Sequence, residues 1–223
     1  MNFQKLISLI LFLLIGLQSF AQDDEDYVEF NDRKNVVHGV YVGINMHYGE
    51  IKGKDTYMTG LKVAYVANQQ FEVGLSTMGF YSEQNLKGNL SSKNEDLIGG
   101  YLGLHLEPIF FSKHRVNLSF PVMIGGGAIG YVDGDIFEND DFDYDNEDIE
   151  TSDIVFVVEP GVNILFNVSR YLQLEAGVRY RISSEIDLAP NSVSRISGFS
   201  AGIGLKVGVF NLGRNRYKKK VSN

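Results

Sequence analysis

The most distinctive chemistry in the sequence is a run of carboxylates. Residues 133–153 read DGDIFENDDFDYDNEDIETSD, with 11 acidic residues in 21 and no Lys or Arg. Carboxylates at alternate positions resemble the first ligands of a calcium-binding loop, which supplies oxygen ligands from its positions 1, 3 and 5. Four side chains have this alternate spacing and are candidate ligands for a divalent cation: Asp141, Asp143, Asp145 and Glu147.

The calcium-loop pattern in this run is incomplete. Counted from Asp141, the sixth position is Asn146 instead of Gly, and the twelfth is Ser152 instead of Glu. An EF-hand is therefore not expected, and two interpretations remain. Loosely bound Ca²⁺ would offset the repulsion between neighbouring carboxylates. A solvated acidic loop with no ion is the alternative, and no other cofactor is predicted.

A second candidate for chemistry is the pair His105 and Glu107. The two residues lie two apart, so a strand would place them on one face, where they could act as an acid–base pair. A structural hydrogen bond inside a barrel is the simpler interpretation. A lipid hydrolase would need a Ser activated by a nearby His, and no His-x-Ser pattern occurs. The sequence therefore predicts a protein that is not an enzyme.

The segments that would position these residues alternate between apolar and polar residues with a period of two. Such alternation predicts strands. The alternating segments are eight, each about 11 to 18 residues long, and no other apolar run after the N-terminus is long enough for a helical membrane span. Their ranges are 38–49, 55–67, 70–81, 97–110, 114–131, 153–167, 170–183 and 194–210.

Two architectures fit eight amphipathic strands: a soluble barrel or sandwich with the apolar face inside, or a membrane barrel with that face toward lipid. Aromatic residues gather at both ends of the apolar face, as at two membrane interfaces. Link lengths also alternate as in outer-membrane barrels. Short links near Asn68–Gln69, Phe111–His114 and Val168–Ser169 alternate with longer ones at 49–54, 82–96, 132–152 and 184–193.

The polar faces of the strands carry charges of both signs. Inside a narrow eight-stranded barrel such charges must pair, because an unpaired buried charge is costly. We therefore predict an all-β, eight-stranded antiparallel up-and-down transmembrane barrel with short periplasmic turns, long extracellular loops and a plugged lumen. Its predicted lumen network comprises Lys62, Glu72, His105, Glu107, Arg115, Glu159, Glu175, Arg179, Arg181 and Lys206.

The ends of the chain indicate export. Residues 1–21 have one Lys, an apolar core of about 12 residues and small residues at Ser19 and Ala21, which is typical of a signal peptide; an uncleaved anchor helix is the alternative. The expected organisation is a signal peptide at 1–21, an acidic lead-in at 22–37, the barrel at 38–210 and a basic tail at 211–223. The net charge of −8 argues against nucleic acid as a partner.

With these features the sequence resembles the PorT-like outer-membrane β-barrel proteins of Bacteroidota. The resemblance rests on the signal ending SFAQ, the first strand VVHGVYVGINMHYGEI and the final strand SGFSAGIGLKVGVF. It implies an outer-membrane location, contact with outer-membrane lipid and handling by barrel-assembly machinery. The leading functional prediction is a structural or surface-binding role. A component of a protein secretion or surface-assembly machine, with an envelope protein as partner, is the alternative. A lipid-modifying enzyme and a soluble periplasmic ligand carrier rank below these two.

Overall fold

The computed structural model describes residues 37–87, 94–133, 152–188 and 193–212. The predicted signal peptide, nearly all of the lead-in and all of the tail from residue 213 lie outside these ranges, as do the four candidate calcium ligands. Every element in the described ranges is a strand. No helix among the described residues is long and apolar enough to cross a membrane.

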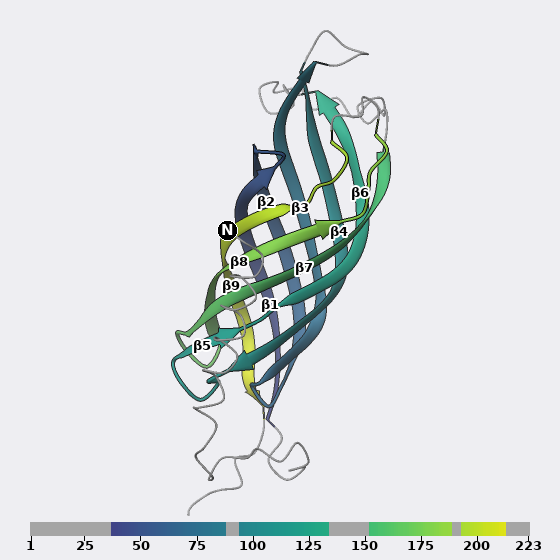
Figure 1. Ribbon diagram of the computed structural model, residues 1–223. Helices are drawn as coiled ribbons and strands as arrows, with labels where there is room; N and C mark the ends of the chain where they lie inside the picture. Colours follow the sequence, from purple (N-terminus) through teal and green to yellow (C-terminus); the bar gives the residue numbers. More distant parts are fainter. Residues whose placement is uncertain (1–36, 88–93, 134–151, 189–192, 213–223) are drawn as a thin grey trace, which may run out of the picture. The chain divides into compact units, whose positions relative to one another are not determined.

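The strands form one closed antiparallel barrel (Figure 1). Neighbouring strands pair around the ring, with β5 and β6 both lying between β4 and β7, and the last strand pairs with the first from Gly49–Ser200 to His38–Leu212, so the sheet has no free edge. The bounds are β1 (His38–Ile51), β2 (Lys54–Ala67), β3 (Phe71–Lys87), β4 (Asn94–Phe110), β5 (Val116–Ser119), β6 (Val122–Asp133), β7 (Ser152–Asn167), β8 (Leu172–Ser183) and β9 (Gly198–Leu212).

The elements β5 and β6 are two halves of one barrel strand. On β4, Ile109 pairs with Ser119 of β5 and Leu106 pairs with Val122 of β6, so three steps along β4 match three steps across the break. The break contains Pro121, which has no N–H to donate to a neighbouring strand. The barrel therefore has eight strands, as predicted, and the predicted fifth strand is interrupted without a change of register.

The connections define two ends of the barrel, which we call the turn end and the loop end. The turn end holds the links β2–β3, β4–β5 and β7–β8, and the loop end holds the other four. One loop-end link is shorter than expected: the 49–54 link is a two-residue turn at Lys52 and Gly53. Their φ angles of 53° and 73° fit the tight turn that matches the twist of a hairpin.

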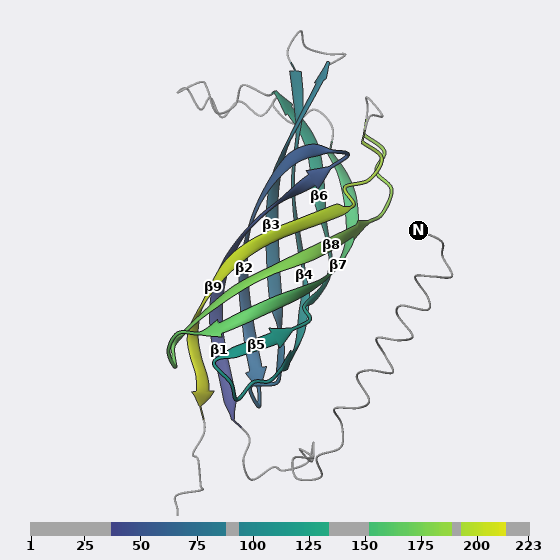
Figure 2. The ribbon, with the colours of Figure 1, turned by 60° about the vertical axis from the view of Figure 1, so that its left-hand side comes forward.

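The predicted 82–96 loop is largely strand. The pairing of β3 with β4 continues past an irregularity after Ser82 to Lys87–Asn94, and this hairpin rises above the β1–β2 hairpin in both views (Figures 1 and 2). Residues 82–87 are mostly polar, so the apolar alternation that marks the rest of β3 stops there and does not predict the extension. Backbone pairing with the neighbouring strand continues without it.

The outer face of the barrel is apolar. On β1, the exposed fractions of Val42, Ile44, Met46 and Tyr48 range from 45% to 61%, while the residues between them are buried. Exposed aromatic residues lie near both ends of the strands, as the sequence predicts. They are Tyr65, Phe71, Phe110 and Phe166 toward the turn end, and Tyr48, Tyr57, Phe156, Tyr180 and Phe199 toward the loop end. An apolar surface of this extent is suited to lipid and not to water.

The lumen contains two chemically different regions. The region nearer the loop end is apolar, and it is partly filled by the described parts of the β8–β9 connection, residues 184–188 and 193–197, which bury apolar side chains there. We call this packed region the apolar plug. Its residues are Ile51, Met58, Met78, Phe80, Leu97, Tyr101, Met123, Ile129, Tyr131, Val155, Val157, Ile186, Leu188, Val193 and Ile196.

Candidate functional site

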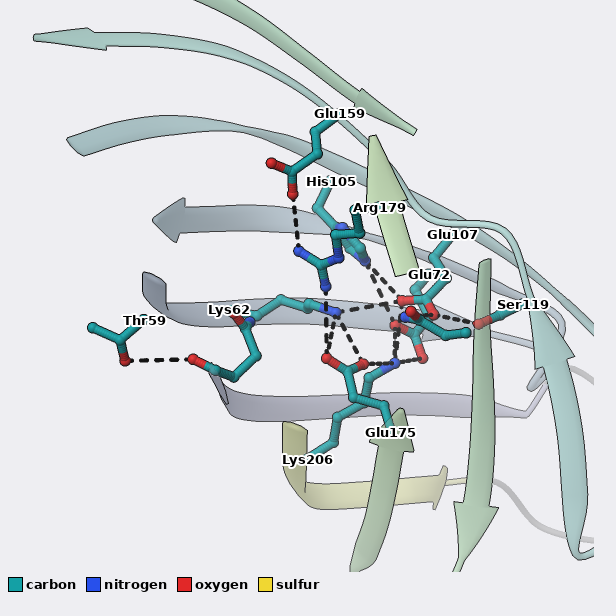
Figure 3. A network of polar contacts seen from close by, with 12 residues as sticks. Thr59, Lys62, Glu72, His105, Glu107, Ser119, Glu159, Glu175, Arg179 and Lys206 are labelled. Atoms are coloured by element: carbon teal, nitrogen blue, oxygen red, sulfur yellow. Dashed lines mark hydrogen bonds and ion pairs between the residues drawn. The ribbon is translucent and has the colours of Figure 1, made fainter. Parts of the chain in front are cut away.

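The second lumen region is a cluster of buried ion pairs, centred on Lys206 of β9 (Figure 3). The Lys206 Nζ atom lies 3.0 Å from Glu72 Oε2, 3.1 Å from Glu107 Oε2 and 3.3 Å from Glu175 Oε2. These carboxylates come from β3, β4 and β8. They meet because each occupies an inward position of its strand, so one ammonium group joins four strands across the lumen.

A second lysine shares two of these carboxylates. The Nζ atom of Lys62 on β2 lies 3.2 Å from Glu175 Oε2 and 3.5 Å from Glu107 Oε2. Both lysines are 1% exposed. Because these ammonium and carboxylate groups are buried, the members of this cluster depend on each other for their charge stabilisation.

The lack of a side chain at Gly204 makes room for the cluster. A Cβ atom at this position of β9 would lie 2.6 Å from both Cγ and Oε1 of Glu175. Any side chain there would displace the carboxylate that both lysines contact. A glycine on the inner face of the last strand is therefore required by the packing of the cluster.

An arginine extends the cluster toward the loop end. The Nη1 atom of Arg179 lies 3.2 Å from Glu159 Oε1, and its Nη2 atom lies 3.8 Å from Glu175 Oε1. The other Glu159 oxygen accepts a hydrogen bond of 2.7 Å from the Tyr101 hydroxyl, which belongs to the apolar plug. Tyr101 is thus the point where the two lumen regions meet.

Hydroxyl and imidazole groups complete the coordination of the carboxylates. His105 Nε2 lies 2.9 Å from Glu107 Oε2, and Ser119 Oγ donates to Glu107 Oε1 at 2.5 Å. On the other side, the Tyr41 hydroxyl donates to Glu72 Oε2 at 2.5 Å. The predicted contact between His105 and Glu107 is present, and it belongs to this buried network of hydrogen bonds and ion pairs.

This arrangement is unsuited to hydrolysis. Glu107 lies between Ser119 and His105, so the serine hydroxyl is bonded to the carboxylate and not to the imidazole that would have to activate it. All three side chains are at most 2% exposed, which leaves no route for a substrate.

One group in the cluster has ligand types that a metal could use. Glu72, His105 and Glu107 each offer one atom, and these atoms lie within 4.8 Å of one another. The Lys206 ammonium already lies 3.0–3.1 Å from both carboxylates. A divalent cation there would face a fixed positive charge at contact distance, so these residues do not fit a metal.

Two of the ten residues predicted for the lumen network are placed differently from the other eight. Arg115 is exposed in the turn before β5, because that strand begins only at Val116, so its predicted lumen position is wrong. Arg181 is buried but contacts the apolar plug: its Nε donates to Ile196 O at 2.6 Å and its Nη1 lies 3.0 Å from Met58 Sδ. The remaining eight form the ion-pair cluster: Lys62, Glu72, His105, Glu107, Glu159, Glu175, Arg179 and Lys206.

Two parts of the lumen were not predicted from the sequence. The first is the set of uncharged partners Tyr41, Tyr101 and Ser119, although the same alternation places them on inward positions. The second is the apolar plug. Its signal is the apolar pair Ile186 and Leu188 within a connection expected to be a long extracellular loop, together with Met and Phe residues on inward positions.

Comparisons with known proteins identify the fold of the chain and no protein family. No protein-family model matches the sequence, and no curated protein matches it. Among solved structures, Neisserial surface protein A (NspA) matches with a TM-score of 0.50 and 14% identity, over 76% of this chain and 96% of that chain. The chain has the fold of a small outer-membrane β-barrel. Its lipid-facing exterior agrees with the predicted outer-membrane location.

Two further solved structures are less similar. Ail, the attachment invasion locus protein of Yersinia pestis, has a TM-score of 0.40 and 15% identity, over 77% of this chain and 98% of that chain. The outer membrane enzyme PagL has a TM-score of 0.37 and 10% identity, over 74% of this chain and 98% of that chain.

Proposed function

We propose that this protein is a non-enzymatic, non-conducting barrel of the outer membrane, with a structural or surface-binding role carried by its two ends. The observation that carries this proposal is the filled lumen. The ion-pair cluster occupies its middle and the apolar plug occupies the part nearer the loop end. A barrel of eight strands has an interior just wide enough for side chains, so little space remains for solutes.

The non-enzymatic role is supported by the described histidines. His47 and His105 are buried in the lumen, His38 bonds to the Tyr65 hydroxyl, and the His114 ring lies edge-on to that of Phe111. Across residues 37–87, 94–133, 152–188 and 193–212, no hydrogen bond joins a serine hydroxyl to an imidazole. The described part of the barrel therefore offers no activated serine for attack on a lipid ester.

The orientation follows from the proposal. Both described chain ends, at Val37 and Leu212, lie at the turn end, which we place in the periplasm, with the loop end outside the cell. The acidic stretch would then be at the cell surface. Binding of Ca²⁺ by Asp141, Asp143, Asp145 and Glu147 stays a prediction, because these residues lie outside the described ranges. Outer-membrane lipid and barrel-assembly machinery are the partners that this location implies.

Conductance across a planar lipid bilayer tests the filled lumen. The purified barrel, inserted at high protein-to-lipid ratio, should give no stable open steps, whereas a porin inserted in the same bilayer gives them. Steady porin-like steps from this protein would show an open aqueous path and would contradict the proposal.

A second candidate function is a component of a secretion or surface-assembly machine. It is favoured by the polar, basic turn end of the barrel, where Lys113, Arg115 and Arg170 are exposed. The sequence resemblance to the PorT-like proteins of Bacteroidota also favours it, and membership of that family remains part of this proposal. Chemical cross-linking in intact cells, followed by identification of linked envelope proteins, distinguishes this role from a solitary surface barrel.

A further inference from the structure

The charged residues in the turns at the turn end are basic. Among the described residues of these three turns, 68–70, 111–115 and 168–171, Lys113, Arg115 and Arg170 are charged and none is acidic. The loop end differs: its described residues include exposed carboxylates, such as Glu50 and Glu185, together with exposed cations, such as Lys52 and Lys54. A ligand recognised by the turn end would therefore be anionic.

A polar pocket lies at the mouth of the lumen on this side. It has a volume of about 280 Å³. Lys113, His114 and Arg170 line it from two turns, and Asn117, Asn167 and Gln173 line it from the strands. The pocket thus combines cationic side chains from the turns with amide side chains from the barrel wall.

The three amides form a row of hydrogen bonds whose direction is fixed. The Nδ2 atom of Asn117 donates to two backbone carbonyls, Phe111 O and His114 O, so its Oδ1 must point the other way. That oxygen accepts from Asn167 Nδ2 at 2.6 Å, and Asn167 Oδ1 accepts from Gln173 Nε2 at 2.6 Å. Because the backbone carbonyls of Phe111 and His114 can only accept hydrogen bonds, reversing any amide in the row would place two donors or two acceptors against each other.

The row ends in an unused acceptor. Gln173 is 5% exposed, and its Oε1 atom is buried without a hydrogen-bond partner among the described residues. A buried carbonyl oxygen without a donor is costly, and such groups in native structures are usually satisfied by water or a ligand. Gln173, one of the residues that line the pocket, therefore carries an unused buried acceptor, and cationic side chains line the same pocket.

We propose that this pocket binds an acidic peptide segment of an envelope protein. A backbone N–H of the peptide donates to Gln173 Oε1, and a carboxylate contacts Lys113 and Arg170. A peptide fits better than a lipid headgroup because the pocket lies within the ring of strands, whereas lipid surrounds the ring from outside. The inference rests on the proposed function only for the periplasmic location of the partner.

The test is a binding titration with the full-length barrel in detergent micelles. The probe is a fluorescein-labelled peptide of four Asp-Gly repeats, followed by fluorescence anisotropy, and the comparison probe has Asn in place of every Asp. The acidic peptide should bind in a salt-sensitive way, and the Asn peptide should bind at least about tenfold more weakly, since contacts with cationic groups dominate at the rim.

Two variants assign the binding to the pocket. The double variant Lys113→Gln/Arg170→Gln should weaken binding of the acidic peptide by about tenfold, and Gln173→Met, which keeps the volume but removes the acceptor, by about threefold to tenfold. The control Lys52→Gln/Lys54→Gln removes the same charge from the loop end and should leave the affinity unchanged. Heat-modifiable migration on a gel verifies that each variant is folded.

Three results would overturn the inference. Equal affinity for the Asp and Asn peptides would remove the role of charge. An equal loss of affinity in Lys113→Gln/Arg170→Gln and in Lys52→Gln/Lys54→Gln would mean that binding depends on the net charge of the protein and not on this pocket. An unchanged affinity in folded Gln173→Met would mean that the peptide makes no hydrogen bond to the Gln173 amide oxygen. None of these results depends on conductance or on the orientation in the membrane, so each would leave the proposed function standing.

Discussion

The ion-pair cluster and the apolar plug are equally buried, yet they fill the lumen by opposite means. In the cluster, Lys206 alone contacts Glu72, Glu107 and Glu175, so each side chain is specified by the charge of its neighbours. In the plug, Ile186, Leu188 and Ile196 enter from a connection and are held mainly by burial. The cluster is formed by side chains of the barrel strands alone, whereas the plug also needs side chains from the connection between β8 and β9.

This difference bears on how each region can open. Breaking a buried ion pair leaves an uncompensated charge inside the barrel, so the cluster should be lost only when the barrel itself unfolds. The β8–β9 connection could leave the lumen while the strands stay paired, at the cost of exposing its apolar side chains. We therefore expect changes in the cluster to act on the whole barrel and changes in the plug to act locally.

The largest effect should come from Lys206→Met. It leaves Glu72 and Glu107 without their nearest cation and should lower the free energy of unfolding by about 3–5 kcal/mol. Urea unfolding in lipid vesicles measures the change. The double variant Lys206→Met/Glu107→Gln, which removes one of the stranded charges, should recover part of the loss. An unaltered unfolding midpoint in Lys206→Met would mean that the cluster does not stabilise the barrel.

The corresponding change in the plug is Ile196→Ala. Ile196 is fully buried, and truncation of a buried Ile costs about 2–5 kcal/mol, toward the lower end where the site can relax. We expect faster proteolytic cleavage within 184–197 with little change in the urea midpoint of the barrel. A midpoint shift as large as that of Lys206→Met would show that plug and barrel unfold together, and the distinction between the two regions would fail.

A smaller effect is expected where the regions meet. Tyr101→Phe removes the hydroxyl that donates to Glu159 Oε2 at 2.7 Å and keeps the ring in the plug. A hydrogen bond to a charged group contributes about 1.5–3 kcal/mol, so the free energy of unfolding in urea should fall by that amount. The matched variant Tyr41→Phe, which removes the hydroxyl bonded to Glu72 within the cluster, should cost a similar amount. A neutral Tyr101→Phe would indicate that the plug is not coupled to the cluster.

The smallest effect should come from the ion pair on the plug connection. Arg195 Nη2 lies 2.6 Å from Glu185 Oε1, but the two side chains are 56% and 78% exposed. Arg195→Ala should cost at most about 1 kcal/mol, because water and salt screen an exposed pair. Cleavage rates within 184–197 at low and high salt measure it. A loss comparable to that of Ile196→Ala would mean that charge, and not burial, holds the connection in place.

The alternation in the sequence is sufficient to predict much of the barrel. A period of two assigns every residue of a strand to the inner or outer face, so the pattern alone places Lys62, Glu72, Glu175 and Lys206 in the lumen. It fails for Arg115 because the pattern does not mark where a strand begins. It also gives no sign of the β3–β4 extension, where backbone pairing continues through mostly polar residues.

The sequence by itself determined the number of strands, the two faces of each strand and the lipid-facing aromatic belts, because these depend only on the order of residues along one chain. It could not determine that Lys206 on β9 and Lys62 on β2 would share carboxylates from β4 and β8. That depends on the register of strands far apart in sequence and on the closure of β9 against β1. Nor could it determine that the side chains of Ile186, Leu188, Val193 and Ile196 are buried in the lumen, since the apolar lumen that receives them exists only once the barrel has closed.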